Sequence, residues 1–340
     1  MYGCDYQLRR IIQHLHKGRL HHQRCSLPLY LSSMRKLSKL FLPLLLIQPL
    51  FIACSDDDDG SQQSERNVNR NDFLQEPSLQ RLEFPRVKGG SSIVVIHTTN
   101  DPFGINYSIE WDCQKKSQRW SCYQMFASNR KQEVKRYYPD TSKGETQYPF
   151  DPDLPAGNYF SYDPFRGSGY DHGHICPSAD RLYSTAANTQ TFYLTNMQPQ
   201  RKAFNSGIWQ KMEEKLRSWI STGSKKEDTL YVCKGGTIDV VSDEGGIKDP
   251  ILTTLPSGLV VPKYFFMALL RKSKTGYKAM AFWAEHLNED HSNDPLSNYV
   301  INVRELERRT GIDFFCNLPD KIEEEVETTT IENIKWLWNF

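Results

Sequence analysis

Short runs of β-branched, aromatic and aliphatic residues recur along the chain, separated by stretches rich in Gly, Pro, Asn and Asp. Runs of this length and composition are typical of β-strands bounded by turns. We predict strands at Ser92–His97, Tyr107–Trp111, Trp120–Phe126, Thr191–Leu194, Thr229–Cys233, Leu259–Leu270 and Tyr277–Trp283. No internal repeat is visible, so we expect these strands to belong to one domain.

Two segments show helical periodicity instead. Within Ser206–Ile220, apolar residues recur three or four positions apart and predict one buried stripe, formed by Ile208, Trp209, Met212, Leu216 and Trp219. Asn302–Thr310 is the second segment, with Gly311 as its C-terminal stop. Many strands and few helices predict an α+β domain, with a mainly antiparallel sheet as its core and flanking helices. We place this domain at residues 81–335 and expect the tail from Lys321 onward to be peripheral.

The first 53 residues follow a different pattern. Met34 opens a segment with three basic residues, Arg35, Lys36 and Lys39, and the run 40–53 after them is almost wholly apolar. A basic start followed by an apolar core too short to span a bilayer comfortably is typical of a secretory signal. We predict that residues 34–53 are this signal and that residues 1–33 are an upstream, non-native segment.

The run Phe51-Ile52-Ala53-Cys54 resembles a bacterial lipoprotein box, in which the Cys is lipidated and becomes the first residue. Phe51 departs from the usual Leu. Four aspartates, Asp56–Asp59, follow closely and resemble the surface-export signal of some Gram-negative lipoproteins, or else form a solvated tether. We therefore expect residues 54–80 to be an acidic and polar tether. The protein would be exported and anchored through Cys54 to the lipid bilayer of a bacterial outer membrane, on its periplasmic or cell-surface side.

The charge balance changes once this segment is set aside. The 340-residue chain is 38% hydrophobic, which excludes both a disordered chain and a polytopic membrane protein. It has 42 basic and 41 acidic residues, a formal net charge of +1. Residues 1–53 hold eight of the basic residues and one acidic residue, so the remainder has 34 and 40, a net charge of −6. Any nucleic-acid site must therefore be a local basic patch.

Five cysteines follow Cys54, namely Cys113, Cys122, Cys176, Cys233 and Cys316. None of them forms a CxxC pair, so a structural zinc site is not indicated. An exported protein permits disulfides, and an odd number of cysteines leaves at least one thiol free. The pairing stays open, although Cys113 and Cys122 would face each other if the runs around 114–119 form a hairpin.

The densest group of chemically reactive residue types is Gly167–Pro177, which includes His172 and His174. Its glycines predict a sharply turned backbone, and such loops carry function when rigid elements hold them. Downstream, four residues are spaced four apart and would form one ridge on a helix: Asn205, Trp209, Glu213 and Arg217. Asn, Glu and Arg beside a histidine loop indicate a metal-assisted hydrolytic site.

These segments resemble the DNA/RNA non-specific endonucleases of the ββα-metal nuclease superfamily, whose signature is Asp-Arg-Gly-His followed closely by Pro. Four blocks match in the family's order: Asp171-His172-Gly173-His174 with Pro177, Asn196-Met197-Gln198-Pro199-Gln200, Asn205-x3-Trp209-x3-Glu213, and Glu305–Gly311 with Asn317-Leu318-Pro319. The resemblance covers the core from about residue 90 to 325. It implies an α+β fold with a ββα-metal active-site motif.

The resemblance also implies roles for single residues. His174 matches the general base, which takes a proton from the water that attacks phosphorus. Asn205 matches the direct protein ligand of one Mg²⁺, for which Mn²⁺ is a substitute, and Glu213 matches the residue that holds metal-bound water. Arg217 matches an arginine near the scissile phosphate, and Asn196 a supporting hydrogen-bonding position. The implied substrates are DNA and RNA, and the implied products carry 5′-phosphate ends.

The chain departs from the family at His172, where the motif usually has Arg, so a permanent charge near the phosphate is lost. The family also places an arginine upstream of the histidine loop. Arg130, Lys135 and Arg136 all lie in the right region, and we choose Arg136. We expect Asp171 to be an orienting hydrogen-bond acceptor rather than a metal ligand.

Two alternative functions remain at this point. His172 and His174 form a His-x-His pair that would suit a zinc-dependent phosphohydrolase, provided further ligands join them. In the other alternative, the change from Arg to His172 abolishes turnover and leaves a non-catalytic, nucleic-acid-binding surface lipoprotein.

Overall fold

The computed structural model describes residues 66–220 and 228–340. The predicted upstream segment 1–33, the predicted signal 34–53 and the predicted lipidation site Cys54 lie outside the described residues. Within the two described ranges, no helix is long and apolar enough to cross a membrane.

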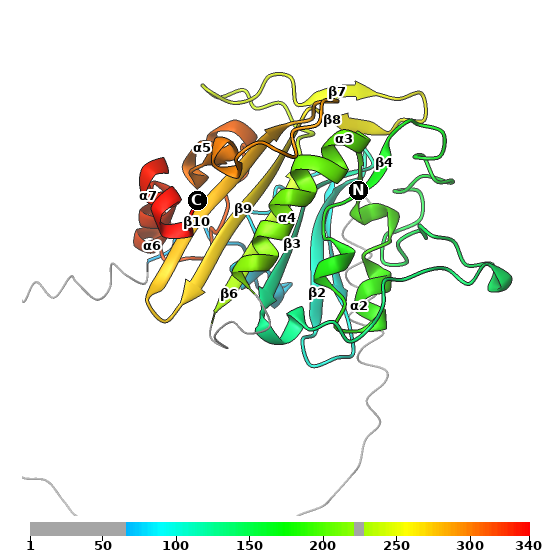
Figure 1. Cartoon of the computed structure of the whole chain (residues 1–340), viewed down its shortest axis with the longest axis horizontal. Helices are drawn as coiled ribbons and strands as arrows, with labels where there is room; N and C mark the ends of the chain where they lie inside the picture. Colours follow the sequence, from blue (N-terminus) through cyan, green and yellow to red (C-terminus); the bar gives the residue numbers. More distant parts are fainter. Residues whose placement is uncertain (1–65, 221–227) are drawn as a thin grey trace, which may run out of the picture. The chain divides into compact units, whose positions relative to one another are not determined.

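Seven strands form one sheet, in which each neighbouring pair is antiparallel (Figure 1). In spatial order they are β1 (Ser92–Thr98), β2 (Ile105–Asp112), β3 (Ser117–Phe126), β6 (Thr229–Gly236), β9 (Tyr264–Ser273), β10 (Gly276–Glu285) and β11 (Val300–Ile301). Two smaller pairs join β4 (Asp171–His174) to β5 (Met197–Gln200) and β7 (Ile251–Thr254) to β8 (Val260–Pro262). The predicted α+β class with a mainly antiparallel sheet is confirmed.

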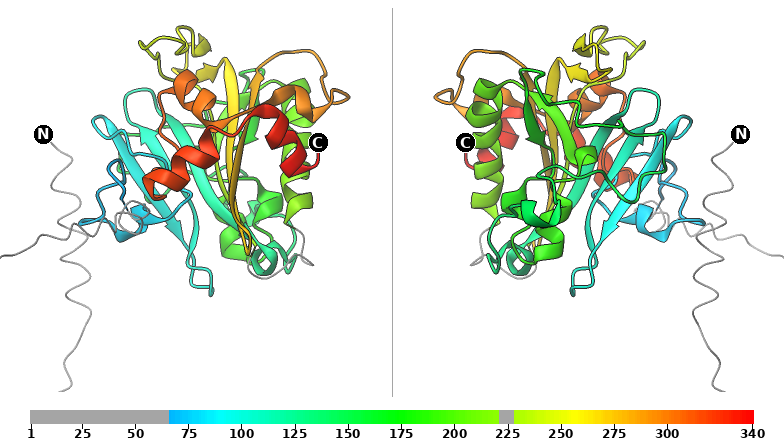
Figure 2. Two further views of the ribbon diagram at one scale, coloured as in Figure 1. Left: turned by 90° about the vertical axis from the view of Figure 1, so that its left-hand side faces the viewer. Right: turned by 90° about the vertical axis from the view of Figure 1, so that its right-hand side faces the viewer.

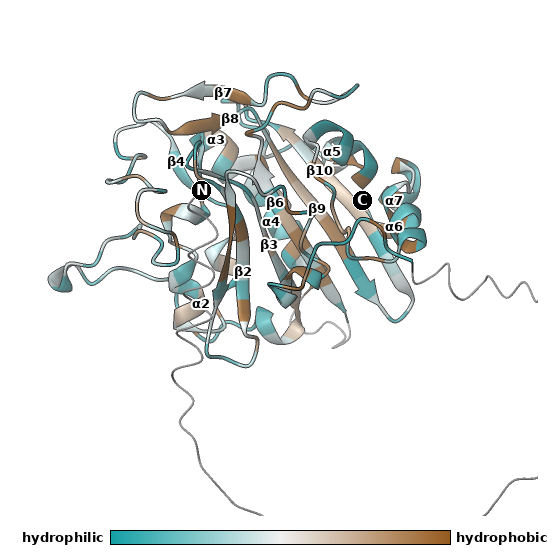
Figure 3. Cartoon of the chain, turned by 180° about the vertical axis from the view of Figure 1, so that it is seen from behind, coloured by the Kyte–Doolittle hydropathy of each residue, from teal (hydrophilic) through white to brown (hydrophobic). Residues whose placement is uncertain are grey.

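Both faces of the sheet are covered, which explains why its central strands are apolar along their length. Residues 265–270 of β9 are all buried and alternate between two hydrophobic cores, one on each face. This alternation follows from the two-residue period of a strand. Figure 3 shows brown, apolar stretches in β9 and β2 and mostly hydrophilic residues on the helices α5 and α6 outside them.

The helices divide between the two faces (Figure 2). Residues of α4 (Gln210–Trp219) and α7 (Ile331–Trp338) pack into one core, and residues of α5 (Val303–Thr310) and α6 (Asp320–Glu327) pack into the other. Two shorter helices, α2 (Thr185–Gln190) and α3 (Lys202–Phe204), lie in the segment that carries the motif residues. The sheet thus has α4 on the same side as the motif segment.

Both predicted helices are confirmed. The predicted segment Ser206–Ile220 corresponds to a π-helical turn, Asn205–Trp209, followed by α4. The predicted segment Asn302–Thr310 corresponds to α5, whose N-terminus is capped by the Asn302 side chain. Gly311 ends α5 with a φ of 65°, the left-handed conformation for which glycine is favoured.

Most predicted strands are confirmed with ends that differ by a few residues, but two predictions were wrong. Thr191–Leu194 is not a strand, since Thr191 ends α2 and Leu194 begins a short 3₁₀ turn. An apolar run of four residues is too short to reveal its period, and the Ser184 cap that starts α2 lies upstream of it. Leu259–Leu270 contains two strands, β8 and β9, which separate at Lys263.

The first described residues pack onto the domain that we predicted to begin at residue 81. The Asn67 side-chain amide donates hydrogen bonds to the backbone carbonyls of Cys316, at 2.9 Å, and Leu318, at 2.5 Å. Asn71 is buried, and its amide donates to the Pro85 carbonyl at 2.9 Å. Residues 66–80, which the sequence assigned to the tether, therefore form part of the folded body.

The C-terminal tail is not peripheral, contrary to the sequence-based expectation. Ile334 and Trp338 of α7 are buried in the same core as α4, and the Trp338 ring lies 4.6 Å from that of Trp219. The burial of α7 could not be predicted from the sequence, because three threonines and an acidic run precede it and a single short amphipathic helix gives a weak pattern.

The five described cysteines are free thiols. Cys113 does not face Cys122, because the register of β2 and β3 places Ser108 opposite Cys122. Cys122 instead lies opposite Cys233 of β6, and burial raises the pKa of both thiols well above the ordinary value.

Candidate active site

Strand β4 carries the Asp-His-Gly-His sequence and pairs with β5, so that His174 lies opposite Met197. The glycine between the two histidines has a packing reason. A Cβ atom at Gly173 would lie 2.4 Å from the Gln200 side chain, so only glycine lets the two strands approach in this way. Gly167 and Gly169 before the strand have positive φ angles, which confirms the sharply turned backbone predicted there.

His174 is partly buried, and its Nε2 atom has no hydrogen-bond partner among the described residues. Its ring packs edge-on against Phe192, with centroids 5.0 Å apart. The exposed Arg136 places its guanidinium 4.7 Å from the centre of the same Phe192 ring. Burial, and then the charge of Arg136, lower the pKa of His174 from 6.5 to about 3. The imidazole is therefore neutral at physiological pH and has a nitrogen that can accept a proton.

His172 is held within an aromatic stack. Its ring lies parallel to that of Tyr148, with centroids 3.6 Å apart, and its other side faces Phe165 at 4.4 Å. Nε2 donates to the Asp163 carboxylate at 3.0 Å. Burial alone would raise the pKa of Asp163, but the hydrogen bond and charge of His172 outweigh it and lower that pKa. His172 thus has an anionic partner that the sequence pattern did not indicate.

Asn205 stands where the chain enters its π-helical turn. Its Nδ2 donates to Asp171 Oδ2 at 3.1 Å, which joins the start of the helix directly to β4. Within residues 66–220 and 228–340 the Asn205 side-chain oxygen has no hydrogen-bond partner, so that oxygen can serve as a ligand. Gly207 interrupts the helical geometry with φ −103° and ψ −112°, and π-helical turns of this kind are frequent at functional sites. Asp171 accepts this hydrogen bond, the contact through which it would orient Asn205.

His286 holds the backbone at Arg201, the residue just before α3. His286 Nε2 accepts a hydrogen bond from the Arg201 backbone N–H at 2.7 Å, and Nδ1 donates to the Pro262 carbonyl at 2.9 Å. Burial lowers the pKa of His286 to about 4, so the ring stays neutral and keeps one acceptor and one donor nitrogen. His286 therefore has a structural role, which could not be predicted because no sequence motif surrounds it.

Glu213 lies one turn into α4 and is paired with a lysine that sequence reasoning missed. Lys234 Nζ lies 2.6 Å from Glu213 Oε1, while Arg217 lies 3.9 Å from the other carboxylate oxygen. Lys234 is fully buried on β6, with Nζ 4.7 Å from the centre of the Trp209 ring. Burial raises the pKa of Glu213, and the charge of Lys234 opposes that rise.

Arg217 belongs to a second buried ionic group centred on Asp180, which is 1% exposed. Asp180 accepts hydrogen bonds from Arg217, at 3.3 Å, and from the Tyr123 hydroxyl, at 3.0 Å. Arg130, one of the upstream candidates, lies 3.6 Å from the same carboxylate. Arg130 therefore helps to hold Asp180, whereas Arg136 is the exposed arginine near His174.

Asn196 is completely buried and braces the backbone behind β4. Its amide nitrogen donates to the carbonyls of Cys176, at 2.8 Å, and Thr191, at 2.7 Å. Its side-chain oxygen accepts from the Cys176 N–H at 2.9 Å. Three hydrogen bonds from one side chain fix the end of the histidine strand against the segment that follows α2.

The site thus unites residues that are distant in the sequence: the β4 strand, the start of the α4 region at Asn205, and Glu213. The side chains able to hold a metal here offer oxygen atoms, from an amide and from carboxylates, which suits a hard divalent cation. Lys234, Asp180 and Asp163 could not be found from the sequence, because each is a single charged residue without a recognisable spacing.

The zinc alternative has no geometric support. Among the described residues, the group of histidine and carboxylate side chains with ligand atoms close enough to share a metal is His97, Asp151 and Asp153. His172 and His174 do not belong to such a group, and His172 Nε2 is already engaged by Asp163.

Comparison with known proteins identifies the family of this chain. Residues 90–321 match the family model described as DNA/RNA non-specific endonuclease. A nuclease of Nostoc sp. is 30% identical over 233 residues, which cover 65% of this chain and 75% of that protein. The mitochondrial nuclease EXOG of Xenopus laevis is 26% identical over 220 residues, covering 63% of this chain and 58% of that protein. The mitochondrial endonuclease G of Homo sapiens is 25% identical over 182 residues, covering 53% and 59%.

The fold is also found among solved structures. EndoG in the crystal structure of the EndoG/EndoGI complex superimposes with a TM-score of 0.53 at 19% sequence identity, covering 67% of this chain and 89% of that chain. At this identity the likeness concerns the fold, which has the same mixed α+β architecture. The family match spans the β4 strand, Asn205 and Glu213 in one alignment. This chain belongs to the DNA/RNA non-specific endonuclease family.

Proposed function

We propose that this nuclease is a Mg²⁺-dependent endonuclease that hydrolyses phosphodiester bonds of both DNA and RNA and leaves 5′-phosphate ends. The observation that carries the proposal is the meeting of His174, whose Nε2 atom has no hydrogen-bond partner among the described residues, with Asn205, which is joined to the same strand through Asp171 at 3.1 Å. A general base must be unprotonated at the working pH and must reach the proton that it removes. His174 meets the first requirement through burial and the nearby charge of Arg136.

The residues around His174 fit a magnesium ion. Asn205 has a side-chain oxygen free for a ligand, and the carboxylates of Asp171 and Glu213 lie on the elements that flank it. Mg²⁺ prefers oxygen ligands and retains several waters, so a single direct protein ligand with water-holding carboxylates is consistent with its chemistry. When bound, the ion would neutralise charge that develops on the phosphate and the leaving oxygen. Mn²⁺, which also accepts oxygen ligands, is expected to replace it.

Each side chain then has a chemical task. His174 takes a proton at Nε2 from a water molecule, and the water oxygen forms a bond to phosphorus. The bond from phosphorus to the 3′ oxygen breaks, and the leaving oxygen takes a proton from solvent water, so one product ends in a 3′ hydroxyl and the other in a 5′ phosphate. Arg136 and Arg217 provide positive charge for the phosphate. Contacts of this kind address the backbone rather than the bases, which accounts for low sequence specificity.

The replacement of the family arginine by His172 alters the charge near the phosphate. His172 is stacked between Tyr148 and Phe165 and bonded to Asp163, so its position is fixed although its charge is not permanent. We propose that the exchange weakens phosphate binding without abolishing turnover, because His174, Asn205 and Glu213 do not depend on it.

We also propose that the nuclease is a lipoprotein exported to the outer membrane and anchored through Cys54. The proposal rests on the basic and apolar segment 34–53 and on the acidic residues after Cys54. The mass of the protein isolated from its native host tests it: a mature chain that begins at Cys54 and carries lipid agrees, whereas an unlipidated N-terminus contradicts it.

The proposed chemistry is tested by incubating the full-length chain with supercoiled plasmid and with single-stranded RNA, in Mg²⁺, Mn²⁺, Zn²⁺ or EDTA. We expect both substrates to be cut in Mg²⁺ and Mn²⁺, neither in EDTA, and the product ends to be 5′ phosphates. Cutting that needs Zn²⁺ would favour the zinc phosphohydrolase. Binding of the nucleic acids without cutting in any metal would instead support a non-catalytic binder.

A further inference from the structure

A second group of possible metal ligands lies away from His174 and Asn205. His97 stands near the end of β1, and Asp151 and Asp153 follow Phe150 in the long segment between β3 and β4. One ligand atom from each of the three residues lies within 4.8 Å of the other two. The nuclease mechanism proposed above uses none of them.

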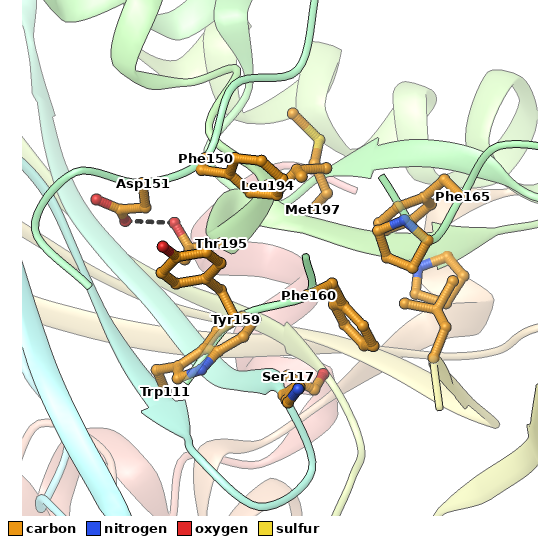
Figure 4. A pocket seen from close by; sticks show the side chains of 14 residues that line it. Trp111, Ser117, Phe150, Asp151, Tyr159, Phe160, Phe165, Leu194, Thr195 and Met197 are labelled. Atoms are coloured by element: carbon orange, nitrogen blue, oxygen red, sulfur yellow. Dashed lines mark hydrogen bonds between the residues drawn. The ribbon is translucent and has the colours of Figure 1, made fainter. Parts of the chain in front are cut away.

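The first two residues of this group are held rigidly. His97 and Asp151 have fully buried side chains, and His97 Nε2 donates to Asp151 Oδ2 at 2.8 Å. The His97 ring is stacked on Tyr107, with centroids 4.4 Å apart. The Thr195 hydroxyl donates to the same Asp151 oxygen at 2.5 Å (Figure 4). A cation bound between His97 Nε2 and Asp151 would replace the proton that they share, which would be released to solvent, and the packed side chains would already stand close to their bound positions.

The third residue leaves the group with excess negative charge. Asp153 is partly buried, and its carboxylate has no hydrogen-bond or ion-pair partner within the described residues. No lysine or arginine in these ranges forms an ion pair with Asp151 either. Asp151 is paired with His97, whereas the partly buried Asp153 adds a second negative charge that a divalent cation would balance.

We propose that His97, Asp151 and Asp153 bind one Zn²⁺ ion at a structural site separate from the nuclease centre. An imidazole nitrogen with two carboxylates is a usual set of ligands for zinc, whereas Mg²⁺ and Ca²⁺ prefer oxygen alone. The Thr195 hydroxyl or a water would complete four ligands. The proposal does not depend on the proposed nuclease mechanism.

The site would fix the segment that supports the nuclease centre. Asp151 follows Tyr148 by three residues, and Asp163 lies farther along the same segment. Tyr148 and Asp163 both contact His172. A zinc ion would tie this segment to β1. Figure 4 shows Asp151 and Thr195 at the wall of an apolar pocket, beside Phe150 and Leu194. Loss of the ion would make the position of His172 less fixed, but it would not remove a catalytic group.

The test compares zinc binding by the full-length chain, its Asp153→Asn variant and its Asn205→Ala variant after treatment with a chelator. Zinc per chain is measured by atomic emission, and zinc affinity by competition with a chromophoric chelator. The four histidines before residue 53 are common to all the proteins, so the difference between proteins isolates the site. Asp249→Asn, at an exposed aspartate outside the group, is the matched control.

We expect Asp153→Asn to hold one zinc ion fewer per chain at equal free zinc and to bind at least tenfold more weakly. Asn205→Ala and Asp249→Asn should retain the ion. Zinc should also raise the melting temperature of the wild type and of Asn205→Ala, but not that of Asp153→Asn. A cooperative melting transition of Asp153→Asn without zinc would show that this variant is folded. Equal zinc content and equal thermal response in the wild type and Asp153→Asn would overturn the proposal, as would loss of the ion in Asn205→Ala.

Discussion

Lys234 shows how much of the site depends on residues without a motif. Its ammonium group is fully buried, and its ionic partner is Glu213 at 2.6 Å. A buried charge is tolerated when it is paired, and removal of one partner leaves the other uncompensated. The histidine, asparagine and glutamate of the site could be located from their spacing in the sequence. Lys234 and Asp180 could not, because a strand lysine and a lone aspartate have the same appearance wherever they occur.

Replacing Lys234 by methionine should lower nuclease activity in Mg²⁺ by about 10- to 100-fold, the usual effect of losing a residue that orients a metal-site group. Without Lys234, burial raises the pKa of Glu213 further, so the acidic limb of the pH–rate profile should move to higher pH. Steady-state kinetics across pH measure both effects. Lys321→Met, at an exposed lysine on α6, is the control. An unchanged profile for Lys234→Met would show that the ion pair does not act on catalysis.

At the scale of elements, α5 and α6 are joined by a cluster of carboxyl groups. Arg304 of α5 lies 3.5 Å from Glu307 and 3.1 Å from Glu327, and one carboxylate oxygen of the buried Glu327 has no hydrogen-bond partner in the described part of the chain. Burial raises the pKa of Glu323 to about 7 and raises the pKa values of Glu307 and Glu327 as well, and repulsion from nearby carboxylates adds to each rise. These helices therefore hold bound protons near neutral pH.

Stability should consequently fall as the pH rises. Between the ordinary value of 4.5 and the raised values, the folded protein binds more protons than the unfolded chain, so the stabilisation is complete at low pH and is lost on titration. We expect the free energy of unfolding to decrease by roughly 2–3 kcal/mol between pH 5 and pH 8 because of Glu323 alone, and to decrease further because of Glu307 and Glu327. Glu327→Gln should flatten the dependence, whereas Glu325→Gln, at an exposed position, should not. Denaturant unfolding at both pH values measures it; a slope that Glu327→Gln leaves unchanged would disprove the assignment.

The elements also show where sequence patterns succeed. The long strands of the sheet and the two helices with a clear stripe or cap could be predicted, because their periodicity extends over many residues. Thr191–Leu194 could not, since four apolar residues fit a strand or the end of a helix equally well. The separation of β8 from β9 at Lys263 depends on two different pairing partners, β7 and β6, and such long-range pairing leaves no local pattern.

At the scale of the whole molecule, both ends of the described chain pack against the domain. Residues 66–80 contact the segment before α6, and α7 fills the core beside α4 through Trp338. The tether and the peripheral tail expected from composition were polar on average, and an average conceals the few buried positions. The family match from 90 to 321 likewise ends before α7, so the structure assigns this last helix to the fold.

Trp338→Ala should destabilise the folded protein by about 3–5 kcal/mol, because it removes a large buried side chain and leaves a cavity against Trp219. Trp336→Ala is a matched control two residues earlier in the same helix, where the side chain is 77% exposed. The control should change stability by less than about 0.5 kcal/mol. Chemical denaturation followed by circular dichroism measures both. Equal effects of the two variants would mean that α7 is not part of the core.

The central claim is that a neutral His174 removes the proton from the attacking water. The most direct measurement is kcat/KM for plasmid cleavage in Mg²⁺ by the wild type, by His174→Ala and by His291→Ala, a partly exposed histidine paired with Asp294. Unchanged circular dichroism and melting temperature establish that the variants are folded. The account predicts a loss of about 100- to 10,000-fold for His174→Ala and none for His291→Ala. Cleavage by a folded His174→Ala at the wild-type rate would contradict it.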